Sequence, residues 1–236
     1  MRLSAFQLKI FAMILMVIDH VYTYIPGMPM WMHHPGRIVA PIFFYFVVEG
    51  FFYTNNRTKY ATRIFLWVAI MFAGSTVLQY IFPTKGGLPN NIFLSLGLSI
   101  ILLIVIDYTR RMKSYFIGVQ AAILTALLGV FTEASILGVG MTLIFYFFRE
   151  KKLWLIITYT LISLFEVPYV IINEGVFTDM GLLGYNNQWM TVFALPFFLL
   201  YNGECGLNNA FTKYMFYIFY PVHLWIIYTI GYFESK

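Results

Sequence analysis

Nine apolar segments follow one another along this chain of 236 residues, and each approaches the length of a helix that crosses a lipid bilayer. A spanning helix needs about 20 mostly apolar residues. The composition agrees, because 61% of the residues are hydrophobic and only 11% are charged, whereas roughly a quarter of a soluble domain is charged. We therefore predict an all-α fold, a polytopic transmembrane helix bundle that forms a single domain over residues 1–236. The expected spans are 6–25, 37–53, 61–82, 91–107, 114–131, 134–148, 152–172, 189–201 and 212–232, of which the sixth and eighth are short.

The basic residues predict the orientation of these spans. With the N-terminus inside, twelve Lys and Arg residues fall on its side of the membrane, and Arg37, Lys85 and Lys236 fall on the other. Because cytoplasmic loops carry an excess of Lys and Arg, the N-terminus should be cytoplasmic. The excess of basic residues in the chain is then explained by its membrane topology, so it gives no reason to expect a nucleic-acid partner. Cys205 is the only cysteine, which excludes an intrachain disulfide.

Three ionisable residues, Lys9, Asp19 and His20, lie inside the first apolar segment. Such groups are costly in hydrocarbon, so they indicate a functional site. Lys9 and His20 are 11 residues apart, about three helical turns, which places them on nearly the same face and roughly 16 Å apart along the axis. His20 is the strongest candidate for a general base, because imidazole titrates near neutral pH. Its alternative role is a hydrogen bond between helices. Asp19 should contact another helix, because adjacent residues of a helix do not face each other.

Arg37 and Glu49 bracket the second apolar segment. Glu49 is near the predicted cytoplasmic end, where an ion pair with Lys9 is one expectation and a role in binding is another. Arg37 is near the external end, where we expect it to pair with Asp19 or to polarise an acceptor.

A cationic cluster of Arg57, Lys59 and Arg63 follows the second segment. Arginine binds phosphate through its planar fork and lysine binds it as a point charge, so the cluster is a candidate phosphate site. The alternative is the ordinary basic bias of cytoplasmic loops. His223, in the last segment, is either a packed histidine or a direct participant. His33 and His34 are too few ligands for a metal site, and we expect no metal.

Several motifs resemble those of a known family, the TraX family, and stand in the same order. They are Leu8-Lys9-Ile10, the run from Ile14 to His20, Gly36-Arg37-Ile38, Pro41-Ile42-Phe43, Glu49-Gly50-Phe51, Leu200-Tyr201-Asn202-Gly203, Lys213-Tyr214 and the run from Phe216 to Leu224. The founding member of that family is associated with N-terminal acetylation of conjugative pilin subunits. The spacing of Lys9 and His20 is also similar to a first-helix signature of the wider integral-membrane acyltransferase superfamily.

The resemblance implies a prokaryotic multi-pass membrane acetyltransferase that uses acetyl-CoA as acyl donor. It assigns His20 as the catalytic histidine and Lys9 as its basic partner, and it assigns Arg57 and Arg63 to the coenzyme. The main hypothesis is acyl transfer from cytoplasmic acetyl-CoA to a hydroxyl or amine of an external acceptor, such as a pilin N-terminus or a glycan. Two rivals stay open. One is a proton-coupled transporter with Asp19, His20, Glu49 and Arg37 as a relay, and the other is a non-catalytic scaffold for pilus or envelope assembly.

Overall fold

The computed structural model describes residues 2–84, 87–88, 91–184 and 187–235. Within these residues the regular structure is helical, apart from one isolated bridge between Leu3 and Tyr201. The all-α prediction is therefore confirmed for the described part of the chain. Lys85 and Lys236, two of the three basic residues assigned to the external side, lie outside it.

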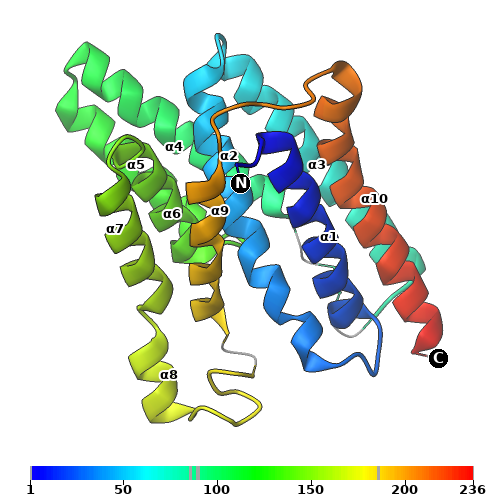
Figure 1. Cartoon of the computed structure of the whole chain (residues 1–236). Coiled ribbons are helices and arrows are strands. Elements are labelled where there is room, and N and C mark those ends of the chain that lie inside the picture. The colour runs from blue at the N-terminus through cyan, green and yellow to red at the C-terminus, as the bar shows by residue number, and fades with distance from the viewer. Residues whose placement is uncertain (1, 85–86, 89–90, 185–186, 236) are drawn as a thin grey trace. The chain divides into compact units, whose positions relative to one another are not determined.

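The helices follow one another in the order shown in Figure 1. They are α1 (Ala5–Tyr24), η1 (Met30–Met32), η2 (His34–Ile38), α2 (Val39–Tyr53), α3 (Arg57–Ile81), α4 (Ile92–Met112), α5 (Tyr115–Val130), α6 (Ser135–Phe147), α7 (Lys152–Leu164), α8 (Val167–Asn173), η3 (Gln188–Ala194), α9 (Leu195–Leu200) and α10 (Ala210–Glu234).

Each of the nine predicted segments contains helix, but only six helical segments are long and apolar enough to cross a membrane. These six are Ala5–Tyr24, Met30–Tyr53, Arg57–Ile81, Ile92–Met112, Lys152–Asn173 and Phe211–Glu234. Three shorter apolar helices, Tyr115–Val130, Ser135–Phe147 and Gln188–Leu200, correspond to the fifth, sixth and eighth predictions. Pro168 and Pro196 lie in the first turns of α8 and α9. Proline lacks an N–H and so cannot continue the helix before it, which explains why the seventh segment is divided into α7 and α8. The eighth segment changes from η3 to α9 at Leu195, the residue before Pro196.

The described contacts divide the chain into two compact units. The first unit comprises residues 1–42, 74–88 and 156–236, and the second unit comprises residues 43–73 and 89–155.

Helices α1 and α10 lie side by side and parallel in the first unit (Figure 1). The ring of Phe6 lies 6.1 Å from that of Phe216 at the N-terminal ends of the two helices, and the ring of Tyr24 lies 5.7 Å from that of Tyr228 further along both helices.

If α1 and α10 each cross the membrane once in the same direction, the total number of crossings is odd. Six long segments make an even number, so one or all of the three shorter helices would then have to cross as well.

The beginning of α1 is fixed by its own cap and by the connection between α9 and α10. Ser4 and Gln7 form a capping box, and the N–H groups of Ala5 and Phe6 donate to the carbonyl oxygens of Glu204 and Cys205, at 2.9 and 3.1 Å. These bonds satisfy N–H groups that a helix leaves without internal partners. Cys205 therefore lies on the same side as the N-terminus.

In the second unit, α4 packs on α5 and α6 through small polar residues. The Thr142 hydroxyl donates to Ser99 Oγ and the Ser95 hydroxyl donates to Thr132 Oγ1, each at 2.9 Å. Gly138 packs so closely on Phe44 that an added Cβ would lie 2.8 Å from the ring. Small residues of this kind allow membrane helices to approach closely.

The predicted orientation can be tested with the native cysteine, because Cys205 is exposed and lies beside the N-terminus. We expect a membrane-impermeant maleimide to label Cys205 only after the cells are permeabilised. In a Cys205→Ser background, Trp31→Cys in η1, where the tryptophan is 60% exposed, should be labelled in intact cells. Labelling of Cys205 in intact cells would reverse the assigned orientation.

Candidate functional site

The first unit holds a buried pair of histidines, one from α1 and one from α10. His20 Nδ1 lies 2.8 Å from His223 Nε2, and the two rings are stacked with their centroids 4.9 Å apart. Only 6% of His20 and 8% of His223 is exposed. His223 Nδ1 lies 2.6 Å from the carbonyl oxygen of Phe219, one turn earlier on α10.

These contacts define the tautomer of both rings when they are neutral. A carbonyl oxygen only accepts hydrogen bonds, so His223 Nδ1 must carry a proton and donate it to Phe219. His223 Nε2 is then an acceptor, and His20 Nδ1 must donate to it. His20 Nε2 consequently carries the lone pair, and no hydrogen bond engages it within the described residues. This is the protonation state that a general base requires.

Lys9 also faces α10. Its Nζ lies over the ring of Phe216, 5.2 Å from the centroid. Lys9 and His20 therefore both contact α10, and the shared face that their spacing predicted is confirmed.

A second chain of polar side chains joins the end of α1 to η2. His33 Nδ1 lies 2.6 Å from Asp19 Oδ1, and the guanidinium of Arg37 contacts His33 Nε2. Because guanidinium only donates, His33 Nε2 accepts from Arg37 and its Nδ1–H donates to Asp19. Gly36 makes this arrangement possible, because a Cβ at this position would collide with the Asp19 carboxylate. The predicted pairing of Arg37 with Asp19 thus occurs through His33, a residue for which we had predicted no role.

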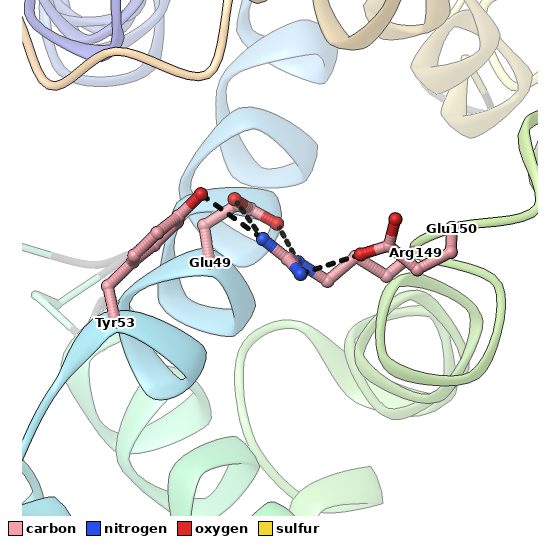
Figure 2. Close-up of polar contacts among 4 residues, drawn as sticks. All are labelled: Glu49, Tyr53, Arg149 and Glu150. Atoms are coloured by element: carbon pink, nitrogen blue, oxygen red, sulfur yellow. Dashed lines mark hydrogen bonds and ion pairs between the residues drawn. The ribbon is translucent and has the colours of Figure 1, made fainter.

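Glu49 forms a buried ion pair in the second unit. Arg149 Nε donates to Glu49 Oε1 at 2.6 Å and Arg149 Nη2 donates to Oε2 at 3.2 Å (Figure 2). Arg149 Nη1 also donates to Glu150 at 2.7 Å. The hydrogen bond to Glu49 raises the pKa of Arg149, so the guanidinium stays charged. An ion pair of Glu49 with Lys9, in the first unit, was one of two expectations; within the second unit the partner of Glu49 is Arg149. The two parallel bonds require the planar fork of an arginine, and spacing along the sequence does not identify which arginine supplies it.

The predicted phosphate cluster is only partly available to a ligand. Arg57 contacts Asp107, which also binds Arg111 Nε at 2.8 Å. Lys59 is exposed and has no carboxylate partner within the described part of the chain. Arg110 is likewise exposed, and its guanidinium lies over Phe147 at 4.9 Å from the ring centroid. Arg63 lies over Tyr60.

The sequence matches the family model described as TraX protein over residues 4–231. The chain belongs to the TraX family. It is also similar to the probable fimbrial assembly protein FimC, serogroup H1, of Dichelobacter nodosus, with 25% identity over 239 residues that cover 94% of this chain and 93% of the relative. No solved structure matches.

The start of the chain meets one of the TraX motifs, Leu200-Tyr201-Asn202-Gly203, in the first unit. Leu3 N–H donates to Leu200 O at 2.8 Å, and Asn202 N–H donates to Leu3 O at 3.0 Å. Gly203 follows with φ of +84°, a conformation that strongly favours glycine. The pair of His20 and His223 joins the TraX run from Ile14 to His20 to the run from Phe216 to Leu224.

Proposed function

We propose that this TraX-family chain is a membrane acetyltransferase. It moves an acetyl group from cytoplasmic acetyl-CoA to an amine or hydroxyl of an envelope acceptor, such as a pilin N-terminus or a glycan. The observation that carries the proposal is the buried His20–His223 pair, which leaves the lone pair of His20 Nε2 available for a proton.

The proton transfers follow from the tautomers. His20 Nε2 accepts the acceptor's proton as the acceptor nitrogen or oxygen forms its bond to the acetyl carbon. The carbon–sulfur bond then breaks, and the proton on His20 neutralises the departing thiolate. While His20 is charged, its Nδ1–H donates to His223 Nε2, 2.8 Å away, which stabilises the imidazolium. The Phe219 carbonyl keeps His223 in the tautomer that can accept.

The donor requires cations that can bind its phosphates. Lys59 and Arg110 fit this requirement because each is exposed and has no carboxylate partner among the described residues. Arg63 is the third candidate. Arg57 is a weaker candidate than the sequence suggested, because a phosphate would have to compete with Asp107. Acetyl-CoA supplies the activated acetyl group, and these residues would hold the coenzyme.

A second candidate function, assembly without catalysis, is favoured by the name of the Dichelobacter nodosus relative, a probable fimbrial assembly protein. The envelope acceptor in our main proposal is consistent with the same context, because a pilin is the subunit of such a fibre. Binding of coenzyme A distinguishes the two functions, because only acetyl transfer requires it.

We expect coenzyme A to raise the melting temperature of the purified protein, because a ligand at about 100 times its Kd stabilises the native state by about 2.7 kcal/mol. The double variant Lys59→Gln/Arg110→Gln should lose most of the shift. The control Lys151→Gln removes an exposed charge from another loop and should keep it. An unchanged melting temperature at saturating coenzyme A would favour the assembly role.

A further inference from the structure

A cavity of about 510 Å³ opens at the C-terminal end of α1, in the first unit. It is lined by the last residues of α1, by the loop that follows and by His33. Pockets that bind small molecules have volumes of about 300–1,000 Å³, so this cavity has room for part of a substrate.

Tyr24 connects this cavity to the histidine pair, because it lines the cavity and also contacts His20. The two residues are four apart on α1, and residues with this spacing are neighbours on one face of a helix. Their rings meet edge to face with centroids 6.3 Å apart. His20 therefore lies one helical turn deeper than Tyr24, on the face of α1 that carries both.

The helix α10 closes against α1 at the level of Tyr24. The ring of Tyr228 lies 5.7 Å from that of Tyr24, and Gly231 approaches so closely that an added Cβ would collide with the carbonyl oxygen of Tyr24. A side chain changes its rotamer much faster than packed helices move apart. The ring of Tyr24 is therefore the part of this contact that can open a path from the cavity to His20.

Three polar side chains of the cavity wall give their protons to other groups. The hydroxyl of Tyr22 donates to Met30 Sδ at 3.1 Å, and the hydroxyl of Thr23 donates to the carbonyl oxygen of Asp19 at 2.9 Å. His33 donates from Nδ1 to the Asp19 carboxylate. These side chains therefore offer a ligand mainly acceptor atoms.

The end of α1 adds further acceptors and a negative potential. Pro26 has no N–H, so the carbonyl oxygen of Tyr22 lacks the donor that normally lies four residues further along a helix. The C-terminal end of a helix also carries a partial negative charge, which attracts cations and repels anions. The cavity is therefore suited to a ligand that donates hydrogen bonds and carries no negative charge.

We propose that the acceptor of the acetyl group reaches His20 through this cavity, with Tyr24 as the gate on its path. The cavity selects an acceptor that presents hydrogen-bond donors and no negative charge. This inference rests on the proposed acetyl transfer. By the predicted orientation, the acceptor approaches from the external side.

The variant Met28→Trp tests the path, because Met28 lines the cavity and a tryptophan would fill much of it. We expect kcat/KM for the acceptor to fall by roughly tenfold or more, since an overfilled space no longer admits a ligand without strain. The KM for acetyl-CoA should be unchanged. The control Met32→Trp alters a half-buried methionine that is not part of the cavity lining, and it should keep both values.

A chemical measurement tests the gate without acetyl transfer. In right-side-out membrane vesicles that carry His20→Cys and Cys205→Ser, an external cationic methanethiosulfonate should modify the new thiol. Adding Tyr24→Ala should speed this reaction about tenfold, because one aromatic barrier is removed, whereas Tyr24→Phe should not. The rate with the cationic reagent, divided by the rate with an anionic one, should be about threefold higher at His20→Cys than at the exposed Trp31→Cys.

Two matched pairs of probes separate an amine acceptor from a hydroxyl acceptor. Alaninamide should protect Met28→Cys from modification better than alanine does if the cavity takes an amine. Glucose should protect it better than glucuronate does if the cavity takes a neutral hydroxyl compound.

Equal values of kcat/KM in Met28→Trp and Met32→Trp would overturn the path, and a modification rate that ignores the size of residue 24 would overturn the gate. Equal protection within both pairs of probes would overturn the selection by charge. If His20→Cys does not fold, Met28→Trp and the probe pairs decide the question. Gated, charge-selective access without any acetyl transfer would leave the cavity standing as a binding site and remove the proposed activity.

Discussion

Replacing His20 by glutamine is expected to slow acetyl transfer by about 10²–10⁴-fold, the usual contribution of a general base. Glutamine keeps a polar side chain on α1 but cannot take up the acceptor's proton. The protein should still insert into the membrane and should still show the melting shift with coenzyme A. The rate is best measured in proteoliposomes that contain acetyl-CoA inside, with acetylation of an external acceptor followed by mass spectrometry.

Replacing His223, the partner of His20, should slow acetyl transfer in a pattern that shows whether the two histidines act as a unit. In His223→Leu the His20 Nδ1–H loses its acceptor, so both the tautomer and the imidazolium lose their support. We expect a smaller loss than for His20→Gln, and a double variant no slower than His20→Gln alone, because residues that act as a unit are not additive. The control Thr229→Val removes a hydroxyl elsewhere on α10, where it only donates to Trp225 O, and should leave the rate unchanged. Full activity in His20→Gln would refute the assignment.

The Arg149→Met substitution should destabilise the protein by about 3–5 kcal/mol, the usual cost of leaving one member of a buried ion pair without its partner. The Glu49 side chain is 9% exposed and accepts two hydrogen bonds from Arg149, so its carboxylate would be left uncompensated (Figure 2). Thermal or denaturant unfolding in detergent measures the effect. High salt should not reproduce it, because buried pairs are screened much less than exposed ones.

Arg149 supplies its own matched control, because it pairs with two carboxylates that differ in burial. The Glu150 side chain is 82% exposed, and exposed pairs contribute only about 0–1 kcal/mol. Glu150→Gln should therefore change the stability little. The double variant Glu49→Leu/Arg149→Met should recover most of the loss, because no buried charge remains. A large effect of Glu150→Gln together with a small effect of Arg149→Met would show that burial does not decide the strength of these pairs.

The sequence by itself determined where the helical segments lie and which residues share one face of the first helix. Apolar length is a local property, so each of the nine predicted segments contains helix, although three of those helices are shorter than a full span. Helical periodicity is also local, and it correctly placed Lys9 and His20 toward one neighbour and Asp19 toward another. The TraX motifs likewise depend only on residues and their order.

Only the tertiary structure decided which remote groups meet. The partners His20 and His223 are 203 residues apart, and Glu49 and Arg149 are separated by 100 residues. Helices α1 and α10 each have several polar residues that could have faced the same neighbour, and Arg149 lies in the turn between α6 and α7. Periodicity assigns a side chain to a face, whereas packing of whole helices assigns that face to a partner. For this reason the sequence indicated His20 as the candidate base, and only the fold showed that His20 contacts His223.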